Sequence, residues 1–142
     1  MLSIFKRSKK PRFDIAAIGE NWLVRPLSHE NVQGRLHVRQ VPTHVPRKHF
    51  PVVALAWIED VKKVSDIAAL GRSVKEALEE QGNCLLVLVH ETSERVMWYA
   101  YAADAKSFNG PLSSLGEAGV RWGVNEDRDW LEYEHAKGLV GA

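Results

Sequence analysis

Apolar and polar residues alternate on both sides of a polar segment in the first third of the chain. The alternation covers residues 22–25 and residues 35–39, and the segment between them ends in Gly34. A period of two indicates a strand with one buried and one wet face. Residues 21–41 are therefore predicted to form an antiparallel β-hairpin with its turn in residues 28–34.

The middle of the chain predicts a strand, a helix and a second strand. Residues 52–58 and 84–90 are short, nearly continuous apolar runs, which are typical of strands covered on both faces. Between them, apolar residues recur at helical spacing over residues 65–81. We expect Ser65 to cap this helix at its start and Gly82 to end it.

The last third predicts a strand, a helix, a strand and a closing helix. Alternation returns at residues 95–103 and again at residues 120–124. The region 104–117 between them has a helical apolar face, and Pro111 is expected to start a fresh helical turn there rather than to lie inside a helix. Residues 130–139 are expected to form a short helix capped by Asp127 or Asp129.

The order of these elements predicts the fold class α+β. Residues 51–124 follow the order β-α-β-β-α-β, which indicates a ferredoxin-like sandwich with a mainly antiparallel sheet and two helices on one face. An N-terminal β-hairpin and a short C-terminal helix complete it, and the hairpin either extends an edge of the sheet or covers its open face. Residues 14–142 are thus predicted to form a single domain.

Composition and charge limit the kinds of protein to which this chain can belong. The chain has 142 residues, 45% of them hydrophobic, with one cysteine and a net charge of +1, so it can hold a core without disulfides. Residues 1–13 are basic and are expected to form a flexible tail. The body is mildly acidic, which argues against nucleic acid as a partner. We expect no membrane span and a cytoplasmic location.

Three segments carry a resemblance to a known family. They are Glu-Asn-Trp at residues 20–22, the aromatic strand at residues 97–102, and the acidic turn with Trp130 and Tyr133 in residues 126–133. Together they resemble the bacterial domain-of-unknown-function family numbered 695, which implies a ferredoxin-like α+β domain without assigned chemistry. The C-terminal residues 135–139 depart from the aromatic, proline-ended tail of that family.

The chain is also similar to the family of protein inhibitors of ribonuclease E, which have an acidic ferredoxin-like domain. This second resemblance implies a regulator that binds a partner rather than an enzyme.

Aromatic and acidic residues are the candidate binding groups. Tyr99 and Tyr101 lie on one predicted strand, where they either pack in the core, contact a protein or ligand, or stack on RNA bases. Trp130, Glu132 and Tyr133 lie in the acidic C-terminal segment, which either forms a solvated helix face or meets a basic partner.

The candidates for catalysis and metal binding are weaker. His44 and His49 share a proline-rich loop that lacks cysteine and carboxylate ligands. Cys84 begins an apolar strand, where a thiol is typically a small buried hydrophobe. We therefore expect no catalytic residue, no metal and no cofactor.

The sequence favours an uncharacterised, non-enzymatic protein-interaction or regulatory module that binds a protein partner or associates with itself. The alternative is a small-molecule-binding or enzymatic domain with its pocket between the loop at residues 42–51 and the Tyr99/Tyr101 face. A third interpretation is an RNA-binding sheet face.

Overall fold

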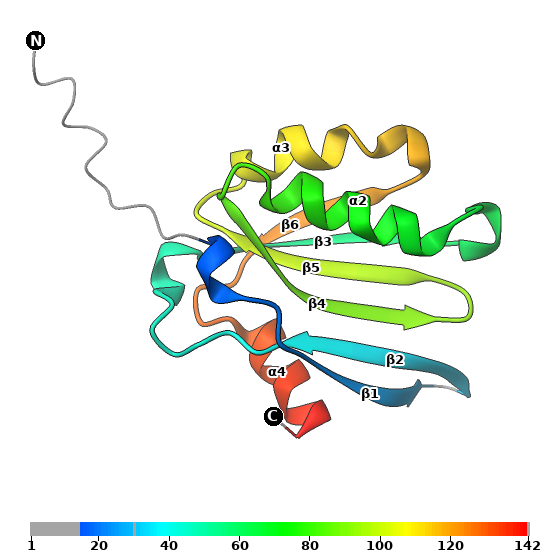
Figure 1. The fold of residues 1–142 in the computed structure, drawn as a ribbon, viewed down its shortest axis with the longest axis horizontal. Coiled ribbons are helices and arrows are strands. Elements are labelled where there is room, and N and C mark those ends of the chain that lie inside the picture. Colours follow the sequence, from blue (N-terminus) through cyan, green and yellow to red (C-terminus); the bar gives the residue numbers. More distant parts are fainter. Residues whose placement is uncertain (1–14, 30, 142) are drawn as a thin grey trace, which may run out of the picture.

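The computed structural model describes residues 15–29 and 31–141. They form a mixed α+β fold with a six-stranded antiparallel sheet and three helices (Figure 1). The expected basic tail, residues 1–13, lies outside the described residues. The elements are β1 (Trp22–His29), β2 (Val32–Arg39), β3 (Val52–Ile58), α2 (Ile67–Glu79), β4 (Cys84–Thr92), β5 (Val96–Ala102), α3 (Lys106–Ser113), β6 (Arg121–Glu126) and α4 (Leu131–Val140).

The strand order in the sheet is β1-β2-β4-β5-β3-β6, and every pairing is antiparallel. The predicted N-terminal hairpin is present as β1 and β2. It extends the sheet beyond β4, with Val38 opposite Leu88, and does not fold over a face. The two edges of the sheet are therefore β1 and β6.

Each face of the sheet carries its own apolar core, because side chains alternate between faces along every strand. The helix face packs against α2 and α3 through residues such as Val74 and Phe108. The opposite face, which we call the α4 face, packs against α4 and the loop before β3 through residues such as Trp130 and Phe50. Figure 1 shows α2 and α3 together and α4 apart from them.

The C-terminal helix covers much of the sheet face that is expected to be open in a ferredoxin-like fold. α4 packs against β1, β2 and β4, and Tyr133, Ala136 and Val140 point from it into the core. The closing helix was correctly predicted, but its position was not. A period of 3.6 shows which side of a helix is apolar and does not show which surface that side meets.

Two helix boundaries differ from the prediction. α2 is capped by Asp66, whose carboxylate accepts the Ala69 N–H at 3.0 Å, and not by Ser65. Pro111 lies inside α3 rather than at the start of a new turn. Proline has no N–H to donate to the carbonyl four residues back, which here belongs to Ser107. The Cys84 thiol donates to that carbonyl oxygen at 3.5 Å, so the acceptor is satisfied.

A buried ion pair replaces the backbone ladder where β2 and β4 separate. Their pairing ends at Val38 and Leu88, beside a register irregularity in β4. Beyond it, Arg39 Nη1 donates to the Leu86 carbonyl at 3.1 Å and to Glu79 Oε2 at 2.7 Å. Glu79 Oε2 also accepts the Leu86 N–H at 2.9 Å. Two charged side chains therefore satisfy the backbone N–H and C=O groups of Leu86, which have no partner in β2.

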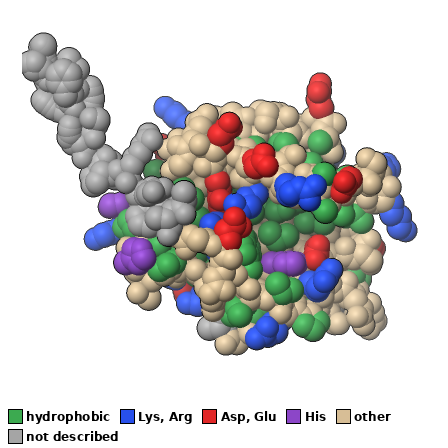
Figure 2. Space-filling view, in the orientation of Figure 1, with side chains coloured by type: hydrophobic (Ala, Val, Ile, Leu, Met, Phe, Trp, Pro, Cys, Tyr) green, Lys and Arg blue, Asp and Glu red, His purple; other side chains and the backbone are tan. Residues whose placement is uncertain are grey.

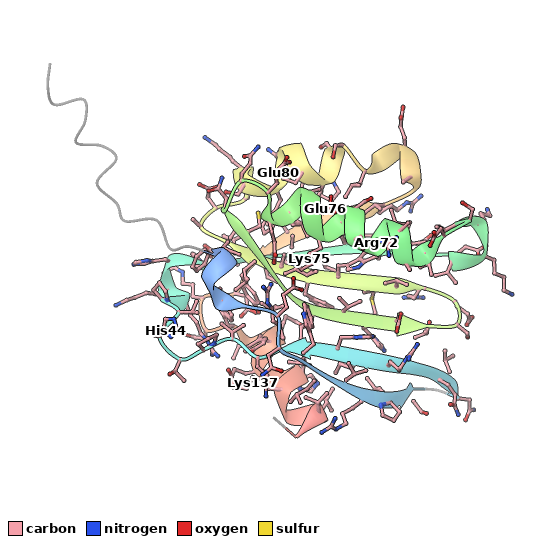
Figure 3. All side chains as sticks on the ribbon, in the orientation of Figure 1. His44, Arg72, Lys75, Glu76, Glu80 and Lys137 are labelled. Atoms are coloured by element: carbon pink, nitrogen blue, oxygen red, sulfur yellow. The ribbon has the colours of Figure 1, made fainter. Side chains whose placement is uncertain are left out.

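The same ion pair is tied to the first described segment. Lys75 Nζ lies 3.0 Å from both Glu79 Oε1 and Glu20 Oε2, and Figure 3 shows where Lys75 leaves α2. Arg39 also donates to the Gly19 carbonyl at 2.7 Å. α2, β2, β4 and the segment before β1 are thus joined through one polar network.

Candidate functional site

An open groove of about 350 Å³ lies on the α4 face, between α4 and the strands β1, β2, β4 and β5. We call it the α4 groove. Its walls are mainly apolar, with polar groups between them. The lining residues are Leu27, Ser28, Leu36, Leu88, His90, Tyr99, Glu132, His135, Ala136 and Leu139.

Strand register and helix period bring these residues together. Leu36 of β2 lies opposite His90 of β4, and Leu88 of β4 lies opposite Tyr99 of β5, so their side chains share one face. On α4 the lining residues are spaced by three and four positions, which places them on one flank of the helix. The groove is therefore formed where this flank passes over the sheet.

A second apolar surface on the same sheet face adjoins the groove. Leu55 of β3 lies opposite Tyr99, and Trp57 of β3 lies opposite Met97. These four side chains, which we call the sheet patch, are all partly exposed. On the β6 side, Leu55 lies opposite Gly123, which has no side chain to cover it. Tyr99 belongs to both surfaces and makes them continuous.

α4 itself carries two exposed leucines. Leu131 is 66% exposed and Leu139 is 51% exposed, although both belong to a helix that buries Tyr133 and Val140. Leu139 lines the groove, and Leu131, eight positions earlier, lies about a quarter of a turn away around the helix axis. The helix therefore has apolar side chains both toward the core and toward solvent.

The polar groups of the groove are a hydroxyl, a phenol, a carboxylate and two imidazoles. Burial raises the pKa of Tyr99, and the nearby Glu132 carboxylate raises it further. The Tyr99 phenol thus keeps its proton at neutral pH and can donate a hydrogen bond. Glu132 is exposed at the rim, where its charge is open to a partner.

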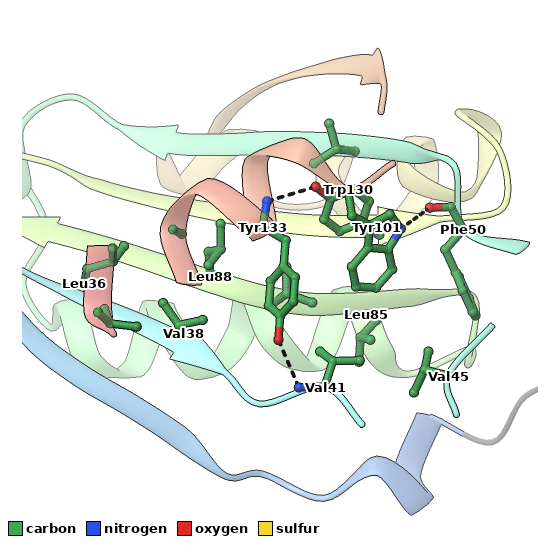
Figure 4. Close-up of a cluster of buried hydrophobic side chains, with 14 of the residues drawn as sticks. Leu36, Val38, Val41, Val45, Phe50, Leu85, Leu88, Tyr101, Trp130 and Tyr133 are labelled. Carbon is green, nitrogen blue, oxygen red and sulfur yellow. Dashed lines mark hydrogen bonds between the residues drawn. The ribbon is translucent and has the colours of Figure 1, made fainter. Parts of the chain in front are cut away.

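Three of the five predicted binding residues lie in the core instead of at the surface. Tyr101 and Trp130 are 0% exposed and Tyr133 is 1% exposed. The rings of Tyr101 and Trp130 stack with centroids 4.1 Å apart, and Tyr133 meets Trp130 edge-on at 5.5 Å (Figure 4). In this fold their side chains have no accessible surface for a ligand.

The polar atoms of these aromatics are all used within the fold. The Trp130 indole donates to the Phe50 carbonyl at 2.8 Å. The Tyr133 hydroxyl donates to the Arg39 carbonyl at 2.6 Å. It also accepts the Val41 N–H at 3.0 Å (Figure 4). Burial, with the bonded Asp127 carboxylate next, raises the pKa of Tyr101 far above its ordinary value. These groups hold α4 on the sheet.

The other two predicted residues, Tyr99 and Glu132, line the α4 groove. The expected pocket beside the loop at residues 42–51 is different from the observed one. Val45 and Phe50 of that loop are buried in the α4-face core, and Arg47 stacks over Trp130 at 5.0 Å. The loop therefore covers the aromatic cluster, and the hollow lies on the far flank of α4.

Sequence reasoning missed most of the groove, including Leu36, His90, His135 and Leu139. One local pattern could have indicated part of it. In residues 131–140 the apolar positions occupy more than one side of a helical wheel, so one side had to remain uncovered. The strand residues of the groove come from four strands, and only the sheet register brings them together.

No chemistry of metal or thiol type is apparent at the described residues. Among them, no three His, Cys, Asp or Glu side chains are placed to hold a metal ion. The Cys84 side chain is fully buried, and burial raises the pKa of its thiol to about 12. A thiol that stays protonated at neutral pH is a poor nucleophile.

The surface in view in Figure 2 carries both signs of charge. Acidic and basic side chains are interspersed there around a hollow lined with hydrophobic side chains. Binding of nucleic acid usually requires a continuous basic area, and this view shows none. None of the helices in the part of the chain that the structure describes has the length and hydropathy needed to span a bilayer.

Comparisons with known proteins identify no family. No family model matches the chain, and neither a curated protein nor a solved structure matches it.

Proposed function

We propose that this protein is a non-enzymatic interaction or regulatory module that binds a protein partner through the α4 groove and the sheet patch. The carrying observation is a continuous, partly exposed apolar surface that runs from Leu139 across Tyr99 to Trp57. Contiguous exposed apolar surface on a soluble domain typically marks an interaction site. Its partner is expected to present apolar side chains to the groove.

The charge at the rim favours a basic group on the partner. Glu132 is exposed at the groove, whereas Glu134 on the same helix pairs with Arg47 at 2.6 Å and with Lys137 at 3.5 Å. Those contacts, first the hydrogen bond from Arg47, lower the pKa of Glu134. Glu132 is thus the carboxylate of α4 whose charge faces a groove ligand.

Site-specific crosslinking tests this proposal. A photoreactive residue at Leu139 is expected to crosslink one protein of the native lysate, also after nuclease treatment. Glu132→Lys is expected to reduce that crosslink at least fivefold, because it opposes the basic group of the partner. The matched control places the same photoreactive residue at Val24, an exposed apolar position of β1 on the opposite face of the sheet from the groove.

Equal crosslinking at positions 24 and 139 would contradict the proposal. So would a product that disappears with nuclease, which would favour nucleic acid instead. If Glu132→Lys leaves the crosslink unchanged, the proposed basic group on the partner is contradicted, and binding depends on the apolar contacts alone.

A small-molecule site is the second candidate, because five polar side chains share the groove. They are Ser28, His90, Tyr99, Glu132 and His135. A volume of about 350 Å³ lies within the roughly 300–1,000 Å³ usual for ligand pockets. Fragment screening by NMR distinguishes the two: a ligand that shifts Tyr99 and His135 resonances and blocks the crosslink at 139 supports this second candidate.

We also propose that residues 52–126 form a ferredoxin-like unit. Support comes from the strand order β4-β5-β3-β6 and from the two crossovers, in which α2 joins β3 to β4 and α3 joins β5 to β6. Membership of the family numbered 695, a bacterial source and a cytoplasmic location stay predictions from the sequence.

A further inference from the structure

We propose that the edge strand β6 pairs with β6 of a second copy of this chain, which joins two sheets into one across a two-fold axis. This inference does not depend on the α4 groove, because β6 lies at the opposite edge of the sheet from the β1 hairpin. It concerns the backbone and side chains of residues 121–126.

The two edges of the sheet differ in their protection. β1 contains Pro26 at its centre, and proline on an edge strand blocks pairing because it lacks an N–H. β6 reads Arg-Trp-Gly-Val-Asn-Glu, has no proline and pairs with β3 without a register shift. Of the two edges, β6 is therefore the one suited to accept another strand.

The direction of one hydrogen bond shows which backbone groups of β6 point outward. The Asp127 N–H donates to the Pro51 carbonyl at 2.7 Å, toward the β3 side. Successive residues of a strand direct their N–H and C=O groups to opposite sides. Asn125, Gly123 and Arg121 thus bond to β3, and the groups of Trp122, Val124 and Glu126 face away from the sheet.

Symmetry then limits the register. Directly opposite residues share a face in an antiparallel pair. A two-fold axis perpendicular to the sheet must therefore pass midway between one residue and the same residue of the second copy. With Gly123 at the axis, Trp122 lies opposite Val124 of the second copy and Arg121 lies opposite its Asn125. The outward N–H and C=O groups of Trp122 then face those of Val124.

The side chains favour this register. Trp122 and Val124 are partly exposed on the helix face, and an aromatic residue opposite a β-branched one stabilises a strand pair. A Cβ built on Gly123 would meet nothing within 4 Å, so there is open space at the axis. A register centred on Val124 would instead place Trp122 opposite Glu126. An interface of one short strand is small, and we expect a weak, concentration-dependent dimer.

Sedimentation equilibrium of the full chain tests the inference. The wild-type mass is expected to rise with concentration toward twice the monomer mass. Val124→Pro removes an outward N–H that the monomer does not use, and at least a tenfold weaker association is expected. Val124→Thr keeps both the N–H and the β-branch and is the matched control, with less than a threefold change. A wild type that stays monomeric at millimolar concentration overturns the inference.

A charge pair tests the register even if Val124→Pro fails to fold. Asn125→Arg brings two like charges together with Arg121 of the second copy and is expected to weaken the dimer at least fivefold. Asn125→Glu brings opposite charges together and is expected to strengthen it. Identical dissociation constants for the two variants would overturn the Gly123-centred pairing.

Discussion

At the scale of single residues, Arg39 is the one charged residue that is buried among those the structure describes. It is 2% exposed. Its guanidinium donates to the Glu79 carboxylate and to the Leu86 and Gly19 carbonyls, and it lies 5.7 Å from the centroid of the Trp22 ring. Buried charges are stable only when they are paired and hydrogen-bonded. The pair with Glu79 does so, and it also supplies the donor and acceptor that the Leu86 backbone lacks.

We predict that Arg39→Met lowers the free energy of unfolding by about 3–5 kcal/mol, because Glu79 then keeps only Lys75 as a cationic partner, and the Leu86 and Gly19 carbonyls lose their guanidinium donor. Arg35→Met is the control. Arg35 lies four positions earlier in β2 with a side chain 65% exposed, and it pairs with Glu91 at 3.3 Å. Its loss should change stability by less than about 1 kcal/mol. Urea unfolding of both variants measures the difference, and similar losses would contradict the role given to the buried pair.

At the scale of elements, the start of α4 holds the helix on the sheet. Trp130 precedes the helix with φ of 56°, a left-handed conformation that is costly for a residue with a Cβ. Its ring stacks on Tyr101 and its indole bonds to Phe50, so packing compensates for the strain. Asp127 completes this junction, since its carboxylate accepts the N–H groups of Leu131 and Glu132 and the Tyr101 hydroxyl.

We predict that Asp127→Ala lowers the free energy of unfolding by about 1–3 kcal/mol, because it leaves buried and helix-terminal donors without an acceptor. Asp129→Ala is the matched control, since Asp129 lies in the same turn and is exposed. It is expected to change stability by no more than about 0.5 kcal/mol. Chemical denaturation followed by circular dichroism compares them. A larger loss of stability from Asp129→Ala than from Asp127→Ala would show that Asp129, and not Asp127, caps α4.

At the scale of the whole molecule, one sheet separates two cores. Leu85 and Tyr101 face α4, whereas their neighbours Leu86 and Ala100 face α2 and α3. Because β4 and β5 contribute to both cores, loss of either core disrupts the strands of the other. The domain is thus expected to unfold as one cooperative unit.

Thiol labelling checks this cooperativity. Cys84 is fully buried in the helix-face core, with its thiol pKa raised to about 12. It is expected to react only when the molecule unfolds, with the same urea midpoint as the near-ultraviolet circular dichroism. The variant Ser113→Cys, at an exposed position of α3, should have a second thiol that reacts at once. A Cys84 midpoint well below that of the aromatic signal would show that the two cores open separately.

Local periodicity was sufficient for most of the elements. Alternation and continuous apolar runs located the strands, and helical spacing located α2 and α3, because each pattern reflects which sides of a segment are buried. It did not predict the cap at Asp66 or the position of Pro111. The first depends on which nearby side chain accepts the Ala69 N–H. The second depends on the Cys84 thiol, which lies 23 residues from Ser107 in the chain and donates to the Ser107 carbonyl.

The candidate site was predicted only in part. Tyr99 and Glu132 line the groove, but Tyr101, Trp130 and Tyr133 are core residues, and the sequence pattern allowed both roles. The identity of an aromatic residue does not show whether it packs in a core or lies on a binding surface. Its role depends on whether another element covers it, and here α4 covers Tyr101 and stops short of Trp57.

The apolar pattern thus accounts for the individual strands and helices, since each pattern reflects burial within one segment. The position of α4 required the tertiary structure, because it depends on contacts between residues as far apart as Arg39 and Tyr133. The groove follows from that packing, and the position of β6 at an edge follows from the strand order of the sheet. Both depend on contacts between segments far apart in the chain, which no local stretch of sequence specifies.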